Sequence, residues 1–357
     1  MMRKRIAVIG GGLSGLAAAF YLKHEWPDAE PIVYEAAGRL GGVIGTERIE
    51  SSDHGSFVID HGADMFATEP PAAIELCRDL GVEDQLIVPD TERAGAMIVH
   101  RGNLVPIPDG FVLMRATKLW QMVTTPLLSV RGKLRFLGER FIGPAPGFPD
   151  RATGEDPAGI SADMSVAQFV RHRMGNEVLD RLVGPLVAGI YTADIEKLSL
   201  NATMAPIVAM VREHGSLAKA TLSRRRDNKD AAERKSAGAR YEKFRGFPGG
   251  MTQLIETLAT AVGTDAIRVD TPVKKLRFDD RSALQWTVES RDHSEAFHDV
   301  ILATPAAVTA ELLAAVDDPS VAESCHAAAA GLVSIESAST AIVVLCVPKS
   351  QISRLPR

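Results

Sequence analysis

A glycine motif near the N-terminus constrains the fold of this 357-residue chain more than any other feature. The β-branched run Ile6–Ile9 predicts a strand that is buried on both faces. Gly10, Gly12 and Gly15 follow at once in GxGxxG spacing, and they open a helix predicted over Leu13–Lys23. Gly10 permits the tight turn, Gly12 lets a pyrophosphate approach the backbone, and Gly15 lets helix and strand pack closely. The motif therefore predicts an anion site at a helix N-terminus.

A second predicted strand, Pro31–Glu35, ends in an acidic residue. Glu35 stands at the roughly 20-residue distance expected for an acid that accepts a ribose hydroxyl in a dinucleotide-binding βαβ unit. Such a unit forms a parallel sheet. The acid disfavours a 2′-phosphate, and hence NADP. The alternative is a glycine turn that binds nothing, and these residues alone do not say which dinucleotide would bind.

Composition excludes several other classes of protein. The net charge of −5 gives no reason to expect nucleic-acid binding, and 24% charged residues is ordinary for a globular chain. Cys77, Cys325 and Cys346 are far apart, which favours a reducing compartment over a disulfide framework. The nine histidines show no metal-ligand spacing, so we predict no metal site. No apolar run approaches the ~20 residues of a membrane-spanning helix, and the N-terminal run is too short for a signal peptide.

A second motif follows the second strand, in the stretch "YEAAGRLGGVIGT". Its pattern, Glu35, Arg39, Gly41, Gly42 and Thr46, resembles the second flavin motif of the FAD-dependent amine oxidase and desaturase superfamily. The physics agrees, because a guanidinium can bind pyrophosphate oxygens and a glycine pair lets the backbone run beneath the ribityl chain and ring. The resemblance implies FAD as the cofactor. The alternative for the arginine is a surface residue after a strand.

The predicted cofactor-binding residues share the two glycine motifs and one later strand. They are Gly10, Gly12, Leu13, Ser14, Gly15, Glu35, Arg39, Gly41, Gly42 and Val273. We assign no catalytic acid, base or nucleophile, because the flavin carries the chemistry and the chain shows no Ser/His/Asp or paired-carboxylate constellation.

Start and stop signals predict several further elements. A helix follows "GADMFATEPP", with Thr68 as N-cap, both prolines in its first turn and Gly81 at C′. A hairpin turns near Gly102–Asn103. The stretch from Asp109 to about Leu200 is predicted to be mostly helix. It includes a capping box of Ser165 and Gln168. A later apolar face has Pro185 as a kink and comprises Val178, Leu179, Leu182, Val183, Leu186, Val187 and Ile190.

The C-terminal third has a different pattern. "FPGGMTQLIETLATAV" predicts a glycine turn into an amphipathic helix, and "IRVDTPVKKLRFDD", "LQWTVES" and "DVILATP" predict strands. Before it, Leu222–Lys243 is rich in charge and poor in apolar residues, so we predict an exposed loop or disordered insert. Because the segment is basic, contact with an anionic membrane surface is the alternative.

Longer segments carry a narrower resemblance. "VIDHGADMF", "GPLVAGIYTADIEKLS", "FPGGMTQLIETL" and "DVILATPAAVTAELL" resemble, in the same order, segments of the oxygen-dependent protoporphyrinogen IX and coproporphyrinogen III oxidases of haem synthesis. Ala63 and Met65 depart from that family's usual proline and serine. No arginine lies between Gly62 and Arg78, so a contact to a substrate propionate cannot be assigned there.

The resemblance implies an α/β fold: a Rossmann-like FAD-binding domain, a second α+β substrate domain and a mostly helical insertion. The expected FAD-binding domain comprises residues 1–70 and 241–307, and the substrate domain residues 71–108, 198–220 and 308–357. Residues 109–197 form the helical domain and residues 221–240 the exposed loop. Family members continue for about another hundred residues, so we expect a truncated chain with an incomplete substrate domain.

The resemblance also implies a reaction. A porphyrinogen would be oxidised to the porphyrin in three two-electron steps, with O2 as acceptor and hydrogen peroxide as product. Candidate partners are the porphyrinogen, O2 and ferrochelatase-type enzymes, with no nucleic acid; the expected location is the cytoplasm, with peripheral contact at the inner face of the membrane. Two alternatives stay open: another FAD enzyme, such as an amine oxidase or carotenoid desaturase, and a fragment that catalyses nothing.

Overall fold

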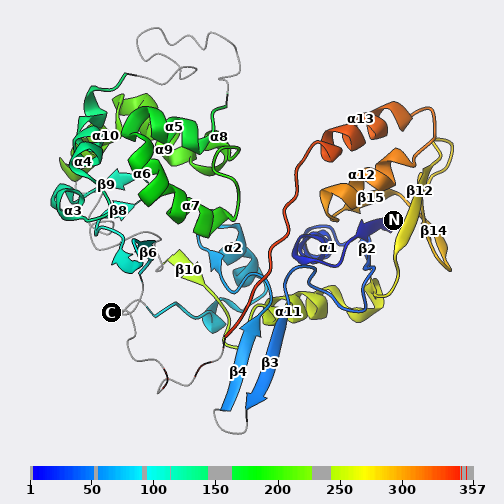
Figure 1. Ribbon diagram of the computed structural model, residues 1–357. Helices are drawn as coiled ribbons and strands as arrows, with labels where there is room; N and C mark the ends of the chain where they lie inside the picture. The colour runs from blue at the N-terminus through cyan, green and yellow to red at the C-terminus, as the bar shows by residue number, and fades with distance from the viewer. Residues whose placement is uncertain are drawn as a thin grey trace. The chain divides into compact units, whose positions relative to one another are not determined.

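The computed structural model describes residues 3–51, 55–90, 95–112, 114–143, 163–226 and 243–345, together with residues 347 and 351. The chain separates into two compact units. Unit 1 comprises Met1–Pro89 and Lys243–Val344, and unit 2 comprises Asp90–Glu242 and Leu345–Arg357. Each unit is described by itself below, with its elements labelled as in Figure 1.

A four-stranded parallel sheet organises unit 1. Its order is β11 (Ile267–Arg268), β2 (Ala29–Tyr34), β1 (Lys4–Ile9) and β15 (Asp299–Leu302). Ile6 pairs with Pro31 on one side and Asp299 on the other, so β1 lies between its two neighbours along its length. The chain leaves β1 toward β2 but returns on the far side as β15, which makes the carboxyl end of β1 a topological switch point. The predicted Rossmann-like sheet is confirmed.

The two faces of this sheet are buried against different layers, which explains the unbroken apolar run in β1. Val8 and Val33 pack with α1 (Leu13–Glu25) and α11 (Thr252–Val262). Ala7 and Ile9 belong to a second core, with buried side chains of β12 (Val273–Phe278), β13 (Trp286–Ser290) and β14 (Ser294–Phe297). The latter three strands form their own antiparallel sheet in the order β12-β13-β14. A strand covered on both faces excludes water from its ladder, so its ends are held firmly.

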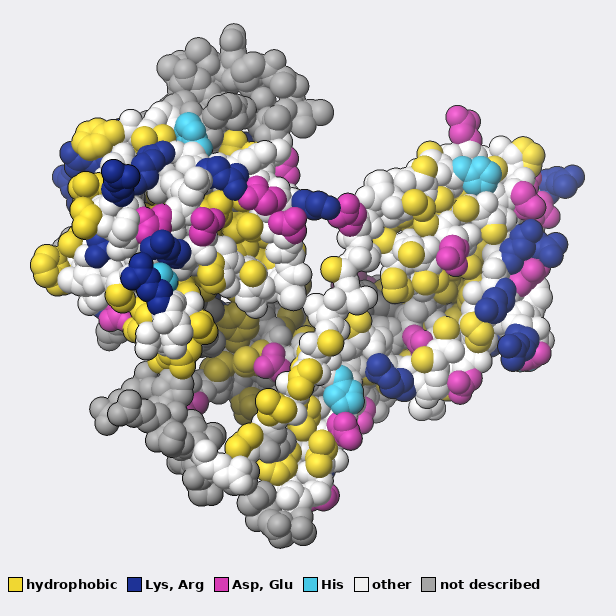
Figure 2. Space-filling model, in the orientation of Figure 1, with side chains coloured by type: hydrophobic (Ala, Val, Ile, Leu, Met, Phe, Trp, Pro, Cys, Tyr) yellow, Lys and Arg dark blue, Asp and Glu magenta, His cyan; other side chains and the backbone are white. Residues whose placement is uncertain are grey.

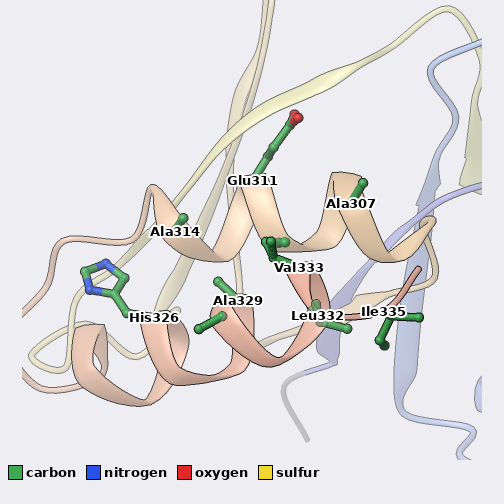
Figure 3. Close-up of a pocket in the computed structure, with 10 residues that line it drawn as sticks. Ala307, Glu311, Ala314, His326, Ala329, Leu332, Val333 and Ile335 are labelled. Carbon is green, nitrogen blue, oxygen red and sulfur yellow. The ribbon is translucent and has the colours of Figure 1, made fainter. Parts of the chain in front are cut away.

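The other elements of unit 1 are short or peripheral. They are β3 (Thr46–Ser51), β4 (Gly55–Asp60), β5 (Phe66–Ala67), α2 (Ala72–Asp79), η1 (Glu83–Gln85), β10 (Phe244–Arg245), η6 (Thr264–Ala266), α12 (Ala306–Ala314) and α13 (Ala322–Val333). β3 pairs with β4, and β5 pairs with β10. An open groove of about 540 Å³ runs along α12 and α13 and is lined mostly by alanine and aliphatic side chains (Figure 3).

The predicted start of α2 is wrong, whereas its end is confirmed. The helix begins at Ala72 with Pro71 as N-cap, and Thr68 lies outside it. Two consecutive prolines explain the difference, because the residue before a proline is disfavoured in helical conformation. Gly81 follows the C-cap with a positive φ of 71°, as a C′ glycine should.

Unit 2 is mostly helical and has its own core. Its strands are β6 (Met97–His100), β7 (Asn103–Pro106), β8 (Phe111–Val112) and β9 (Arg115–Ala116). Its helices are α3 (Leu119–Thr124), α4 (Val130–Leu137), η2 (Gly138–Phe141), α5 (Val166–Met174), α6 (Asn176–Val178), the π-helical η3 (Leu179–Val183), α7 (Gly184–Tyr191), α8 (Leu200–Thr203), α9 (Ala205–His214) and α10 (Leu217–Arg226). The predicted hairpin is β6–β7, and its turn is Arg101–Gly102, one residue earlier than expected.

Local signals in unit 2 are partly confirmed. The capping box of Ser165 and Gln168 opens α5. Of the predicted apolar face, Val178, Leu179, Leu182, Val183 and Val187 are buried and Leu186 is half-buried, whereas Ile190, one residue before the end of α7, is 53% exposed. The small β8–β9 hairpin was not predicted. The expected loop 221–240 is wrong at its start, since Arg226 ends helix α10; residues 227–240 lie outside the described part of the chain.

The three-domain division stays a prediction. The two compact units assign residues 71–89 to the same unit as the parallel sheet, whereas the sequence analysis grouped them with a substrate domain. Among the described helices, none combines the length and the apolar character needed to cross a membrane.

Candidate functional site

The two glycine motifs lie side by side where β1 and β2 end. The Gly10 N–H donates to the Tyr34 carbonyl oxygen at 2.7 Å, which holds the first turn against β2. The Gly41 N–H donates to the Gly11 carbonyl oxygen at 2.9 Å, and Gly12 and Gly41 form a parallel bridge. A loop 30 residues further along the chain thus extends the sheet beside the first motif. The structure brings together what the sequence predicted as two halves of one site.

The three glycines of the first motif differ in whether the packed backbone has room for a Cβ at their positions. A Cβ on Gly15 would lie 1.9 Å from the Gly10 carbonyl oxygen, and a Cβ on Gly10 would lie 2.5 Å from that of Ala303. These two glycines are therefore required by backbone packing. A Cβ on Gly12 would meet only the Gly42 Cα, at 4.0 Å, and the Gly12 φ of −74° suits any residue. The fold itself does not require glycine at position 12, so its backbone is left open to a ligand.

The N-terminus of α1 points its free N–H groups at this open backbone. Gly12 is the N-cap and supplies no side chain to satisfy them, and the first turn carries no acidic residue. The first intrahelical bond runs from the Leu16 N–H to the Gly12 carbonyl at 3.0 Å. The N–H groups of Leu13, Ser14 and Gly15 precede that bond, and helix geometry gives them no partner within the helix. Together with the helix dipole they form a site for phosphate oxygens.

Glu35 sits between the two motifs and braces both. Its Oε2 accepts a hydrogen bond from the Gly11 N–H at 2.7 Å, and its Oε1 accepts one from the Ala37 N–H at 2.8 Å. An ionised carboxylate has about four acceptor sites, so each oxygen can still take a ribose hydroxyl. The sequence predicted the ribose contact but missed that the same carboxylate orders the turn.

Arg39 also acts on its own loop. Its guanidinium donates to the carbonyl oxygens of Leu40 at 3.2 Å, Ile44 at 2.9 Å and Gly42 at 2.7 Å. These bonds wrap the loop around the arginine, in which Gly41 and Gly42 have φ values of 103° and 59°. Such values disfavour side chains with a Cβ. Arg39 is exposed and retains N–H donors beyond these bonds, so a pyrophosphate contact stays a prediction.

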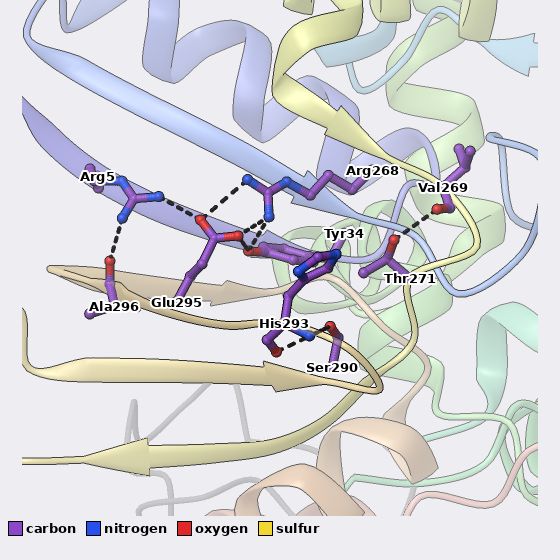
Figure 4. Close-up of polar contacts among 9 residues, drawn as sticks. All are labelled: Arg5, Tyr34, Arg268, Val269, Thr271, Ser290, His293, Glu295 and Ala296. Atoms are coloured by element: carbon purple, nitrogen blue, oxygen red, sulfur yellow. Dashed lines mark hydrogen bonds and ion pairs between the residues drawn. The ribbon is translucent and has the colours of Figure 1, made fainter.

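A polar cluster behind Glu35 fixes the strand that presents it (Figure 4). The Glu295 carboxylate pairs with Arg5 at 2.7 Å and with Arg268, and Arg268 also bonds the Tyr34 hydroxyl. Burial raises the pKa of Tyr34, against the opposing effect of Arg268 and Arg5. These groups tie β1, β2, β11 and β14 together one residue before Glu35, which limits the freedom of its backbone.

Val273 is brought near the motifs by the segment that follows β11. The Glu35 N–H donates to the Arg268 carbonyl and the Thr271 N–H donates to the Glu35 carbonyl, both at 2.8 Å. Val273 follows two residues later and packs against the core beneath β1 and β2. All the predicted cofactor-binding residues therefore belong to unit 1. Their contacts with a cofactor stay predictions.

One part of the neighbourhood was missed. Thr46 Oγ1 donates to Asp60 Oδ1 at 2.6 Å, and Asp60 Oδ1 accepts from the Met251 N–H at 2.9 Å. Thr46 Oγ1 also accepts from the Thr252 N–H at 3.0 Å. A carboxylate and a hydroxyl from distant segments thus cap α11, next to Gly250, whose φ is 82°. Two features of the sequence could have predicted this cap: an acid at the end of "SFVID", and a glycine pair before a helix that lacks an N-cap side chain of its own.

Comparison with known proteins identifies the family of the chain. The family model described as flavin containing amine oxidoreductase matches residues 13–354. The chain is 31% identical, over 306 residues, to a coproporphyrinogen III oxidase of Staphylococcus aureus, covering 85% of this chain and 60% of that protein. It is 31% identical to the coproporphyrinogen III oxidase of Propionibacterium freudenreichii, covering 98% of this chain and 65% of that protein.

A solved structure is also similar to this chain. A crystal structure from Exiguobacterium sp. 255-15, provisionally assigned as a protoporphyrinogen oxidase, matches with a TM-score of 0.70 and 26% identity. The match covers 88% of this chain and 62% of that one. The present chain thus spans about 60% of the length of the proteins it resembles.

Proposed function

Because this chain belongs to the family of flavin-containing amine oxidoreductases, we propose that it oxidises a porphyrinogen to the porphyrin in haem synthesis. FAD is the cofactor, as the resemblance of the second glycine motif implied, and the predicted α/β fold and resemblance to porphyrinogen oxidases are confirmed. The observation that carries the proposal is the identity of 31%, over as much as 98% of this chain, with proteins named coproporphyrinogen III oxidase. Coproporphyrinogen III is therefore the substrate we propose, with O2 as acceptor.

The residues of unit 1 fit the cofactor. When bound, FAD supplies the hydride acceptor for the oxidation of a ring-bridging carbon. The N–H groups at the start of α1, with the open Gly12 backbone, would hold the pyrophosphate. The Glu35 carboxylate would accept ribose hydroxyls while it keeps its bond to Gly11. Arg39 holds the Gly41–Gly42 loop in the conformation that lets the backbone approach the cofactor.

The test measures flavin and turnover separately. The purified chain should show a flavin spectrum and should produce porphyrin fluorescence when coproporphyrinogen III is added in air, with hydrogen peroxide formed. Gly12→Ala is the matched control, because we expect this variant to fold like the parent chain but to bind FAD weakly. A chain that binds FAD yet leaves both coproporphyrinogen III and protoporphyrinogen IX unoxidised would refute the proposed activity. Faster turnover of protoporphyrinogen IX would refute the proposed substrate.

The alternatives give different results in the same experiment. An amine oxidase or desaturase would bind FAD and reduce it with another substrate. A chain that catalyses nothing would give neither flavin reduction nor porphyrin. The cytoplasmic location and contact with ferrochelatase-type enzymes stay predictions.

A further inference from the structure

The carboxylate of Asp60 and the hydroxyl of Thr46 lie at the N-terminus of α11, and neither is among the predicted cofactor-binding residues. Asp60 Oδ1 accepts from the Met251 N–H at 2.9 Å, and Thr46 Oγ1 accepts from the Thr252 N–H at 3.0 Å. The next two N–H groups of the helix donate to carbonyl oxygens three residues earlier, both at 3.1 Å. Because these four donors are all used within the protein, this helix end differs from that of α1 and does not offer a phosphate site.

Asp60 and Thr46 are packed closely as well as hydrogen-bonded. The buried Gly250 backbone lies directly against both, since a Cβ there would be 2.2 Å from Thr46 Cγ2 and 2.9 Å from Asp60 Oδ1. Thr46 Oγ1 donates to Asp60 Oδ1 at 2.6 Å, which joins the two side chains. We call this pair the Thr46–Asp60 clamp. It connects the first residue of β3, the last residue of β4 and the start of α11.

The clamp stands at the end of the loop that carries the second glycine motif. That loop runs from Arg39 into β3, whose first residue is Thr46. It packs on α11, because a Cβ on Gly41 would lie 3.3 Å from Cγ1 of the buried Ile255. Gly41 in turn forms the parallel bridge to Gly12 at the mouth of α1. The place of the glycine pair beside the first motif therefore depends on how β3 and the start of α11 are held together.

The contacts of Arg39 shape this loop but do not place it. Its guanidinium bonds carbonyl oxygens one, three and five residues away, all within the loop itself. The loop is tied to the rest of unit 1 at its start by the bond from the Gly41 N–H to the Gly11 carbonyl. At its end it is tied by the Thr46–Asp60 clamp. Removing the clamp would leave the second end of the loop less firmly held.

We propose that Asp60 is a positioning residue for the flavin: through Thr46 it holds the Gly41–Gly42 loop in the conformation that receives the cofactor. The proposal rests on FAD as the cofactor in the proposed function, but not on the identity of the substrate. Without the clamp the loop would adopt its FAD-binding conformation for only part of the time, and apparent affinity falls with that population. The loss should appear in the rate of FAD association, whereas a lost direct contact appears mainly in the rate of dissociation.

The test measures the rates at which the full chain, freed of flavin, binds and releases FAD, followed by flavin fluorescence in stopped flow. Asp60→Ala should slow association about tenfold and leave dissociation within about twofold of the parent's rate. Asp60→Asn keeps the Oδ1 acceptor and should restore parent-like rates, which separates the hydrogen bonds from the charge. If Asp60→Ala does not fold, Thr46→Val takes its place, because it removes the hydroxyl from a side chain of the same shape, and Thr46→Ser should restore the rates.

Asp318→Ala is the matched control. Like Asp60, Asp318 accepts both a backbone N–H, that of Ser320 at 3.0 Å, and a hydroxyl, that of the same serine. It lies in the segment before α13, which Figure 1 places away from β3 and β4 within unit 1. Figure 2 shows a mixture of hydrophobic and charged side chains over α12 and α13. This variant should therefore bind and release FAD at the rates of the parent chain.

Several results would overturn the positioning role. They are parent-like association in Asp60→Ala, equal losses in Asp60→Ala and Asp318→Ala, an Asp60→Asn variant as slow as Asp60→Ala, or faster dissociation with unchanged association. A parent chain that binds no FAD would overturn it together with the cofactor. A parent chain that binds FAD, shows these rate changes in its variants and oxidises no porphyrinogen would support the positioning role and refute the proposed activity.

Discussion

Replacing Gly12 with alanine separates the needs of the fold from the needs of the cofactor. The Gly12 backbone has φ −74° and ψ 179°, which any residue adopts, and the new Cβ would lie 4.0 Å from its nearest neighbour. Alanine is a poorer N-cap than glycine by up to about 1 kcal/mol, but it lowers the entropy of the unfolded chain by an equivalent of about 0.4–1 kcal/mol. The two effects offset each other. We expect the apo-protein's unfolding free energy to stay within about 1 kcal/mol of the parent's.

FAD binding should respond much more strongly. The methyl group would stand on the backbone that the pyrophosphate must approach, at the mouth of α1. Losing one charge-assisted hydrogen bond to a phosphate oxygen costs about 1.5–3 kcal/mol. That loss corresponds to a roughly 10- to 150-fold weaker dissociation constant. The variant should therefore be a folded protein with little bound flavin.

Gly15→Ala is the contrasting variant. Its Cβ would lie 1.9 Å from the Gly10 carbonyl oxygen, so α1 must move away from the turn. Overpacking against backbone costs about 3 kcal/mol or more. Urea unfolding of the apo-proteins and titration with FAD, followed by flavin fluorescence, measure both quantities. Parent-like FAD affinity in folded Gly12→Ala would refute the ligand role of this glycine, and equal destabilisation of the two variants would refute the packing argument.

Three further predictions concern other contacts. Arg39→Ala and Arg39→Lys should both weaken FAD binding about tenfold, because lysine keeps the charge but not the planar guanidinium that bonds the loop carbonyls. Parent-like FAD affinity of the lysine variant, measured by FAD titration, would show that the charge alone matters. Glu139→Gln or Arg173→Met should each lower the unfolding free energy by about 3–5 kcal/mol, since each leaves a buried charge unpaired; urea unfolding should show the double variant losing less than the sum, and strict additivity would contradict the pairing. Burial, with the hydrogen bond to Asp79, raises the pKa of Tyr21 to about 12. The phenol of the unfolded chain titrates at about pH 10, so the stabilisation from the protonated Tyr21 hydroxyl is complete below that pH and is lost as the pH rises toward 12. Tyr21→Phe should therefore reduce the fall in unfolding free energy between pH 10 and 12. An unchanged midpoint of alkaline unfolding in this variant would contradict the prediction.

Much of the cofactor site could be predicted from local sequence. A buried strand, a tight turn and a helix start are each specified within a few residues, by β-branched runs and by glycines whose φ or packing excludes a Cβ. Gly10 and Gly15 are of this kind, and so is the adjacent pair Gly41 and Gly42. The capping box of Ser165 is equally local. Such features depend on residues close in sequence and not on contacts between distant segments.

Other features depend on contacts between distant segments, which no local pattern encodes. Asp60 caps α11 across 191 residues, and Arg5 meets Glu295 across 290. The sequence misplaced the start of α2 because adjacent prolines competed with a plausible cap at Thr68. It also could not show which side of α4 is buried, since the spacing of Val130, Leu134 and Leu137 is that of a core stripe.

By itself, then, the sequence determined the two glycine motifs and the positions of their acid and arginine, because each follows from backbone conformation and chemistry within about 40 residues, while FAD as the cofactor came from the resemblance of the second motif to a known family. Only the tertiary structure decided that Glu35 orders the turn as well as facing the site, and that Gly12 is the glycine the fold does not require. It also decided that an apolar stripe of unit 2 faces outward. The physical reason is the same in each case: burial and free space are properties of the packed chain, and a side chain's neighbours exist only after folding.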